Sequence, residues 1–269
     1  MLATNGRTRA EDQRFTADES DAKFTNHLFI RLVAKDKIFR RVDFKYCIFD
    51  GCYLRGCKFV QCDFTGCRFL STNCVGSTFT SCEFAYATFE RTIIADDILE
   101  TQAPVFENQK AKFARTLRVN YQQLGEAESV NKAIWIELEA TGTHLYEAWH
   151  SKKDYYRKKY SGIKRIVVLF NWLWFRCLHM LWGNGESAFR LLRSALVLFV
   201  AMGIYHAVRA EDPSKIQSYW NGMWAAPEVF LGTRAIPQYP QAYVAVIAAA
   251  RLLTFAALTS ILLKRFNRR

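Results

Sequence analysis

The hydrophobic residues of this chain are concentrated in two runs near its C-terminal end, residues 191–208 and 242–263. As helices these runs would be about 27 Å and about 33 Å long, close to the thickness of the hydrocarbon core of a bilayer. Arg251 is the only charged residue of the second run. The chain before them is mixed and polar in places, so we predict a soluble part followed by a C-terminal α-helical membrane domain with two spans.

A different periodicity fills residues 24–99. From Phe39 to Ile94 a large residue, replaced once by Cys74, recurs at every fifth position, and a small or thin residue, often cysteine, usually lies two positions before it. A period of five matches neither the 3.6 of a helix nor the 2 of a flat strand, so the chain must turn a corner in every repeat. The predicted core residues are Phe44, Phe49, Phe59, Phe64, Phe69, Phe79 and Phe84, with Cys47, Cys52, Cys57, Cys62 and Cys67.

The segments CDF, CKF, CRF and CEF resemble the pentapeptide-repeat family. The resemblance implies a right-handed quadrilateral β-helix over residues 24–99, with four repeats per coil and both kinds of residue pointing inward. Residues 1–23 contain no apolar core, so they do not form a signal peptide, and we expect them to be disordered.

Regular cysteine spacing also invites a metal or disulfide interpretation. Successive cysteines five residues apart would lie on different faces of the rod, whereas a zinc site needs four converging ligands. Cys47 and Cys67 would stack closely enough for a disulfide, but a cytoplasmic location keeps thiols reduced. We therefore predict small buried core residues and no metal or cofactor. Eight basic and six acidic residues between Lys37 and Asp96 argue against a rod that mimics DNA.

Residues 100–165 are predicted to form a helical connector. Residues 112–124 place Phe113, Leu117 and Tyr121 on one face and end at Gly125, a C-terminal stop. A second helical run follows over residues 128–149, with Gly142 as an interruption. The two runs predict a helical hairpin that packs on the end of the β-helix.

Residues 166–186 are predicted to form an interfacial helix and a turn. The run 166–182 is apolar on most sides but contains Asn171, Arg176 and His179. Its tryptophans and its basic flank favour a helix that lies in the membrane interface, and a third span is the alternative.

Basic residues flank the apolar runs. Residues 152–165 contain seven Lys or Arg, the tail KRFNRR contains four, and the link between the two spans is neutral. By the positive-inside rule, both termini of this multi-pass protein are cytoplasmic. The net charge of +12 is therefore assigned to contact with anionic lipid, and not to nucleic acid.

The stretch from Trp182 to Arg193, WGNGESAFRLLR, resembles the turn before the first membrane helix in bacterial proteins that combine pentapeptide repeats with a potassium-channel-like pore domain. The resemblance implies that residues 187–269 form an outer helix, a pore helix, a filter loop and an inner helix. It also implies a homotetramer around one axis in the bacterial inner membrane.

The filter-like loop in this alignment consists of Phe230, Leu231, Gly232, Thr233 and Arg234. Only one of the two filter glycines of the family is present, and Arg234 would bring a fixed positive charge near the axis. These departures argue against potassium selectivity and favour anions if the side chain points inward.

The proline at position 227 is expected to end the preceding pore helix early. Arg251 and Thr254 are the candidate residues on the inner helix. Three roles are open for Arg251: it lines the pore, pairs with Glu228, or forms a structural contact between subunits.

Together these features predict a pore or ion-channel-like subunit with a cytoplasmic pentapeptide-repeat domain, in contact with the lipid bilayer. Two alternatives stay open, a non-conducting membrane scaffold and a membrane effector of stress or phage defence. Ions, and a protein partner bound by the β-helix, are the other expected partners. An enzyme is not expected, because the five histidines form no metal spacing and no nucleophile or phosphate-loop motif occurs.

Overall fold

The computed structural model describes residues 6–266, with the backbone alone at residue 265. The chain divides between Leu169 and Phe170 into two compact units, which are described separately.

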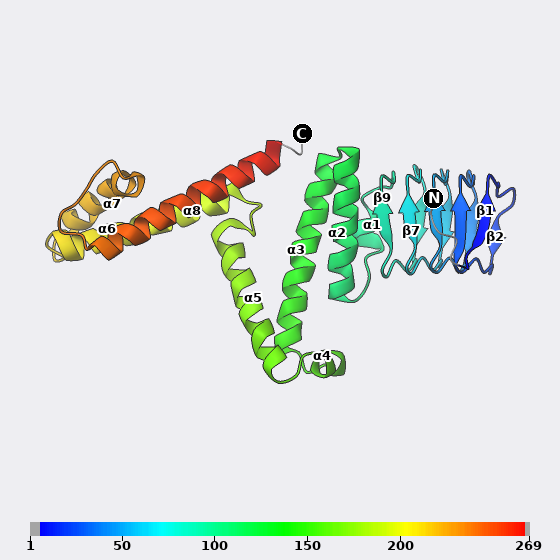
Figure 1. Cartoon of the computed structure of the whole chain (residues 1–269), viewed down its shortest axis with the longest axis horizontal. Coiled ribbons are helices and arrows are strands. Elements are labelled where there is room, and N and C mark those ends of the chain that lie inside the picture. The colour runs from blue at the N-terminus through cyan, green and yellow to red at the C-terminus, as the bar shows by residue number, and fades with distance from the viewer. Residues whose placement is uncertain (1–5, 267–269) are drawn as a thin grey trace. The chain divides into compact units, whose positions relative to one another are not determined.

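The first unit begins with a β-solenoid (Figure 1). Its strands pair in parallel within two sheets, in the orders β1-β3-β5-β7-β9 and β2-β4-β6-β8. Single bridges such as Asp43 to Asp63 and Tyr53 to Asn73 form the other two sides. Partners such as Phe49 and Phe69 are four pentapeptides apart, so each coil has four sides, as the repeat pattern predicts. The strands of the described residues are β1 Thr8–Glu11, β2 Glu19–Ser20, β3 His27–Ile30, β4 Ile38–Arg40, β5 Ile48–Asp50, β6 Lys58–Val60, β7 Arg68–Leu70, β8 Thr78–Thr80 and β9 Thr88–Glu90.

The expectation that residues 1–23 are disordered is wrong for the described residues of that segment, which contain β1 and β2. Ala10 pairs with Phe29, whereas Glu19 pairs with Phe39, so the first coil is one residue shorter than the others. A strict period of five counted backwards from Phe24 lands on Glu19, Arg14 and Arg9, and therefore hides this coil. Residues 1–5 lie outside the described part of the chain.

Stacked phenylalanines fill the solenoid. Phe64 stacks on Phe44 and Phe84 with ring centroids 5.2 and 5.0 Å away, which matches the coil spacing of about 4.8 Å. Of the predicted core phenylalanines, Phe79 is partly buried and the others are buried: Phe44, Phe49, Phe59, Phe64, Phe69 and Phe84. The rings therefore form continuous columns from coil to coil.

The repeat cysteines are hydrogen-bond donors inside this core. The Cys67 thiol donates to the Phe44 carbonyl over 2.9 Å, and the Cys52 thiol donates to the Phe29 carbonyl over 3.4 Å. Thr72 uses its hydroxyl in the same way toward Phe49, over 3.1 Å. In these repeats the position combines a small side chain with a donor, whereas Val42 and Ala87 fill it without one. The predicted core cysteines are buried free thiols: Cys47, Cys52, Cys57, Cys62 and Cys67.

A helical hairpin closes the C-terminal end of the solenoid. It follows the short helix α1 (Ile98–Thr101) and consists of α2 (Glu107–Leu124) and α3 (Ala127–His150). Buried Asn120 accepts a hydrogen bond from the Thr92 backbone N–H over 2.7 Å and donates to its carbonyl over 2.8 Å. Thr116 and Gln123, on the same helix face, bind the backbone N–H groups of Phe89 and Arg91. These side chains satisfy the backbone groups that a further coil would have paired.

The ends of these helices agree in part with the sequence pattern. Gly125, with φ +77°, ends α2 in the left-handed conformation, as predicted. Gly142 does not interrupt α3, because a single glycine weakens a helix by only about 1 kcal/mol and packing against α2 outweighs that. The first unit then ends with α4 (Asp154–Lys159) and the start of α5 (Ile163–Trp182).

The second unit contains the end of α5 and three further helices, α6 (Ala188–Ala210), α7 (Ile216–Leu231) and α8 (Gln241–Phe266). Lys264, near the end of α8, lies 3.2 Å from the Glu186 carboxylate just before α6. The two long helices are therefore antiparallel. By length and composition, α6 and residues 241–264 are apolar enough to cross a membrane.

Candidate functional site

The candidate site is the link between α6 and α8, where α7 packs against α6. Gly203 of α6 and Gly222 of α7 make this crossing close: a Cβ atom on Gly222 would lie 2.6 Å from the Gly203 carbonyl oxygen. It would also lie 2.9 Å from Cβ of His206. Neither glycine can therefore gain a side chain unless the helices separate.

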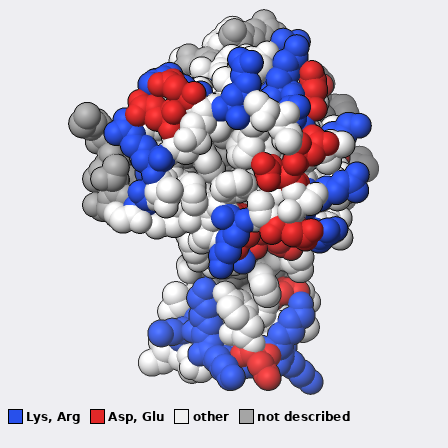
Figure 2. Space-filling view, turned by 90° about the vertical axis from the view of Figure 1, so that its right-hand side faces the viewer, with Lys and Arg blue, Asp and Glu red and all other residues white. Residues whose placement is uncertain are grey.

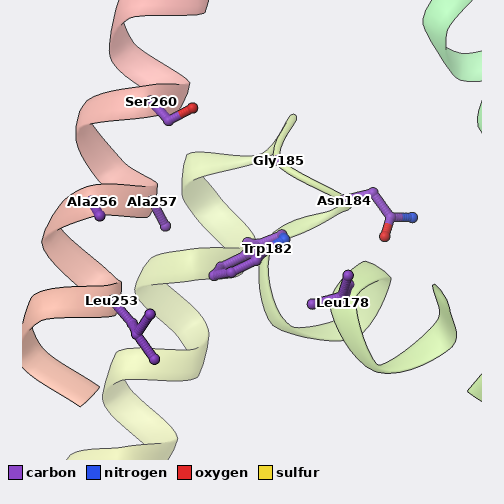
Figure 3. A pocket seen from close by; sticks show the side chains of 8 residues that line it. All are labelled: Leu178, Trp182, Asn184, Gly185, Leu253, Ala256, Ala257 and Ser260. Atoms are coloured by element: carbon purple, nitrogen blue, oxygen red, sulfur yellow. The ribbon is translucent and has the colours of Figure 1, made fainter. Parts of the chain in front are cut away.

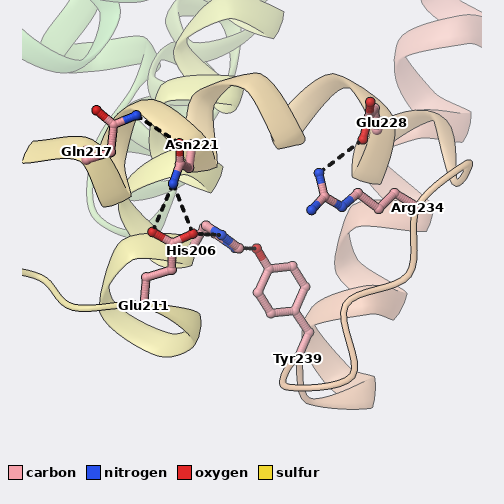
Figure 4. A network of polar contacts seen from close by, with 7 residues as sticks. All are labelled: His206, Glu211, Gln217, Asn221, Glu228, Arg234 and Tyr239. Atoms are coloured by element: carbon pink, nitrogen blue, oxygen red, sulfur yellow. Dashed lines mark hydrogen bonds and ion pairs between the residues drawn. The ribbon is translucent and has the colours of Figure 1, made fainter.

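The filter-like residues end helix α7. Gly232, with φ +81°, is its left-handed C-cap. The Glu228 carbonyl accepts hydrogen bonds from the Thr233 N–H over 2.9 Å and from the Thr233 hydroxyl over 3.1 Å. Arg234 lies 3.3 Å from the Glu228 carboxylate (Figure 4). The segment is therefore a helix cap, and the Glu228 carbonyl is already hydrogen-bonded within the chain.

Phe230 and Leu231 belong to the last turn of α7. Phe230 is buried and packs against Phe199 at 5.4 Å between ring centroids, whereas Leu231 is exposed. The expectation that Pro227 ends this helix early is wrong, since α7 continues to Leu231. A proline deep in a helix loses one hydrogen bond, and here the packing of the following turn outweighs that loss.

The Arg251 side chain reaches from α8 to the end of α7. Its Nη1 donates to the Leu231 carbonyl over 2.8 Å. A cation at the C-terminal end of a helix is favourable because the last carbonyls carry partial negative charge. This contact lies within one chain and differs from the three roles left open by the sequence. Thr254 donates its hydroxyl to the Ala250 carbonyl of its own helix over 2.8 Å.

A buried polar network lies beside the α6–α7 crossing (Figure 4). His206 is 7% exposed, with Nδ1 2.8 Å from the Tyr239 hydroxyl and Nε2 3.4 Å from the Glu211 carboxylate. Asn221 donates to that carboxylate over 3.3 Å. Loss of water around Tyr239 raises its pKa to about 12, so the hydroxyl stays neutral. The network joins α6, α7 and the segment before α8.

Sequence reasoning missed this network because its members are far apart in the chain. The available signal was His206 itself, a polar residue inside an apolar run and three positions before Arg209. Its partners Glu211, Asn221 and Tyr239 follow in three different segments, so only folding brings them together.

The turn between α5 and α6 is held by hydrogen bonds from α6. Arg190 donates to the His179 carbonyl over 3.0 Å and also binds its ring nitrogen. Ser194 donates to the Leu181 carbonyl over 2.7 Å. Nearby, an open cavity of about 440 Å³ lies between this turn and α8, lined by Trp182, Leu253 and Ser260 among others (Figure 3).

In the face of the molecule drawn in Figure 2, Lys and Arg side chains are interspersed with Asp and Glu side chains, and no continuous acidic patch is visible there. In the described residues, no group of three or more His, Cys, Asp or Glu is placed to hold a metal ion. Burial raises the pKa of the Cys52 thiol to about 12 and also raises that of Cys74, which disfavours thiolate ligands.

Residues 38–88 match the family model described as pentapeptide repeats (9 copies). This part of the chain is a pentapeptide-repeat solenoid. The match agrees with the coil geometry: four repeats per coil, stacked phenylalanines and small donors two positions earlier. A comparison with curated proteins finds no match.

A comparison with solved structures finds pentapeptide repeat proteins at low TM-scores. Rfr23 from the cyanobacterium Cyanothece 51142 is 12% identical with a TM-score of 0.26, over 32% of this chain and 69% of that chain. The plasmid-mediated fluoroquinolone resistance protein QnrB1 is 13% identical with a TM-score of 0.24, over 34% of this chain and 61% of that chain. A pentapeptide repeat protein from the Arabidopsis thaliana thylakoid lumen is 16% identical with a TM-score of 0.16, over 43% and 81%. At these scores, the solenoid assignment depends on the family match and the coil geometry.

Proposed function

We propose that this chain is a non-enzymatic subunit of a membrane pore, with the pentapeptide-repeat solenoid in the cytoplasm and α6, α7 and α8 in the bilayer. One observation carries the proposal: only 28% and 11% of the apolar windows of α6 and α8 are buried within the molecule. A core helix of a soluble protein is mostly buried. Exposed apolar helices of this length need lipid or further copies of the chain around them.

The charge distribution supports the orientation. Lys264 and Glu186 tie the end of α8 to the start of α6, so both helices have their basic flanks at the same end. Because Lys and Arg are retained on the cytoplasmic side, we place both termini in the cytoplasm of a bacterium, and the end of α6 and the start of α8 at the outer face of its inner membrane. Anionic headgroups are then the partner of the basic residues around α4.

A permeation path would require several copies, because two helices of one chain cannot enclose it. We propose four chains around one axis, with α8 nearest to the axis. Alanines along α8, including Ala245, Ala248 and Ala256, let such helices approach closely.

The geometry of the link supports a pore that does not select potassium. A potassium filter needs successive free carbonyls aimed at the axis. Here the Glu228 carbonyl accepts from Thr233, and the Leu231 carbonyl accepts from Arg251. Arg234 adds fixed positive charge beside them.

The proposal is tested by conductance in planar bilayers. Purified full-length protein is expected to conduct, and Arg234→Glu should shift the reversal potential toward cation selectivity relative to Arg234→Gln. The Gln variant is the matched control because it removes the charge without reversing it. Protein that never conducts under any stimulus tried would refute the pore.

A second candidate function is a non-conducting membrane scaffold, whose solenoid recruits a protein partner while α6 and α8 only anchor it. The C-terminal end of α7 favours the scaffold, because Gly232 caps the helix and the Leu231 carbonyl is hydrogen-bonded to Arg251. These residues therefore do not form an open filter loop. Conductance that is insensitive to the charge at position 234, or absent, would favour the scaffold.

A regulated form of the pore would be an effector that opens during stress such as phage infection. It is distinguished by the response of cells to high expression. Membrane depolarisation supports the effector, and unimpaired growth with a normal membrane potential contradicts it.

A further inference from the structure

We infer that the cavity at the C-terminal end of α7 is a binding site for a small monovalent inorganic anion, of which chloride is the simplest example. The cavity has a volume of about 250 Å³ and is lined by the end of α7, the following link and α8. Arg234 and Arg251 are the charged residues among its lining, and both are cationic.

The guanidinium of Arg251 has unused donors. It carries five N–H groups, and Nη1 makes a hydrogen bond of 2.8 Å to the Leu231 carbonyl. No ion pair with a carboxylate involves Arg251 among residues 6–266. An arginine about halfway along an apolar helix requires acceptors for its remaining donors. An anion in the adjoining cavity supplies them.

The position of the Arg251 guanidinium depends on the glycine at position 232. Gly232 has φ +81°, a conformation that L side chains rarely adopt. A Cβ atom at this position would lie 2.2 Å from Nη1 of Arg251, so a side chain there would displace the guanidinium. Gly232 therefore ends α7 and, because it has no side chain, leaves space for the Arg251 guanidinium at the cavity wall.

The second cation is only weakly neutralised. Arg234 lies 3.3 Å from the Glu228 carboxylate, and the two side chains are 54% and 56% exposed. Such exposed pairs contribute little, and Glu228 does not line the cavity. Two guanidinium groups therefore face this space with one carboxylate nearby, so these three side chains carry a net charge of +1.

The remaining walls select the kind of anion. Ile236, Val244 and Ile247 are apolar, and the Tyr239 hydroxyl is already bonded to His206. Apolar walls strengthen attraction to the two cations but provide few further donors. Phosphate needs several donors around its oxygens, whereas a monatomic anion does not. A water molecule takes about 30 Å³, so the cavity has room for such an anion with a few waters.

This inference rests on the proposed function only for the surroundings of Arg251, since a bilayer removes the water that would otherwise solvate it. Binding itself is a property of one chain. It can therefore be measured on detergent-solubilised full-length protein, without conductance.

The experiment is a ³⁵Cl NMR titration with chloride as the probe, in which bound chloride broadens the resonance. We expect saturable broadening with the unaltered protein and an affinity at least about tenfold lower for Arg251→Gln, because each charge-assisted contact is a large part of such binding. Arg209→Gln is the matched control: Arg209 is exposed on α6 and does not line the cavity, so its loss should leave the affinity unchanged.

Ala248→Leu keeps both arginines while it fills the cavity, so it decides the question if Arg251→Gln fails to fold. Loss of saturable broadening in Ala248→Leu supports the site. Unchanged affinity in either cavity variant overturns it, as does an equal loss in Arg209→Gln, which would indicate diffuse charge. Chloride binding without conductance refutes the pore alone, and conductance without chloride binding refutes the site alone.

Discussion

The two units of the chain differ in where they place their apolar and polar side chains. The solenoid buries its phenylalanines in continuous columns and satisfies its last backbone groups with Asn120 and its neighbours on α2. The second unit leaves long apolar helices exposed and buries a polar residue, His206, near the end of one of them. The comparison indicates that the first unit covers its apolar core with its own residues, whereas the second leaves apolar helix surface uncovered within one chain.

The difference also concerns how each unit obtains close packing. Repeats of five residues bring identical side chains into register, so the fit of Phe64 between Phe44 and Phe84 recurs along the rod. The helical unit depends on single positions, Gly203 and Gly222, where backbone meets backbone. Substitutions that remove core volume should therefore destabilise the solenoid most, and substitutions that add volume at Gly203 or Gly222 should destabilise the helical unit most.

The largest effect is expected from Phe64→Ala. This ring is fully buried and stacks on two others, so its removal should lower the free energy of unfolding of the solenoid by about 3–5 kcal/mol. Urea unfolding of the full chain in detergent, followed by circular dichroism, measures it. Val75→Ala, at a 39% exposed position of the same solenoid, should change the value by less than about 0.5 kcal/mol.

Gly222→Val should come next, with the effect confined to the helical unit. Its new side chain would collide with the Gly203 carbonyl and with His206, and such overpacking costs about 1–3 kcal/mol or more. The thermal midpoint of the helical signal should fall while the solenoid transition stays in place. Ala201→Val adds a side chain to an exposed position of α6 and should have little effect. A similar drop in both variants would contradict the close crossing.

Asn120→Leu tests the cap that makes the solenoid complete. It leaves the N–H and the carbonyl of Thr92 buried without partners, which should cost about 1–3 kcal/mol. Gln123→Leu removes one contact at an exposed position and should cost less. Equal stability of both variants would show that the cap does not close the rod.

The smallest effect near neutral pH is expected at Cys52, whose contribution is a pH dependence of solenoid stability in alkaline solution. Burial raises the pKa of Cys52 from 9.0 to about 12, so the folded state binds more protons than the unfolded state between these values. Stability should therefore be full below about pH 9 and fall as the pH rises toward 12. Cys52→Thr should reduce the slope of the urea midpoint against pH, since Thr72 already makes the equivalent hydrogen bond. An unchanged slope would contradict this role of the thiol.

Much of the solenoid is predictable because its period is a property of the sequence alone. The stacked positions and their cysteines follow from counting by five, and the hairpin follows from apolar spacing and Gly125. The first coil was missed because the step from Phe15 to Glu19 is four residues long instead of five, which shifts the register of all earlier positions. In addition, the core residue before Phe15 is Ala10, which is too small to stand out in the sequence.

The candidate site was less predictable because its contacts join distant segments. An alignment to a filter motif places residues 230–234 in a loop, but it contains no information on Arg251, whose guanidinium reaches the Leu231 carbonyl from the next helix. The bond from His206 to Tyr239 likewise spans the whole of α7. Such contacts depend on the angle and position at which helices cross, and the local pattern of apolar and polar residues does not determine that geometry.

The central claim is that α8 lies in the hydrocarbon core of a bilayer, and spin-label depth measures it directly. In the Cys177→Ser background the remaining cysteines are buried, and Leu252→Cys places one label on an exposed apolar face of α8. In vesicles, electron paramagnetic resonance should show high accessibility of this label to oxygen and low accessibility to a water-soluble nickel complex. High accessibility to the nickel complex, with little to oxygen, would place α8 in water and contradict the account.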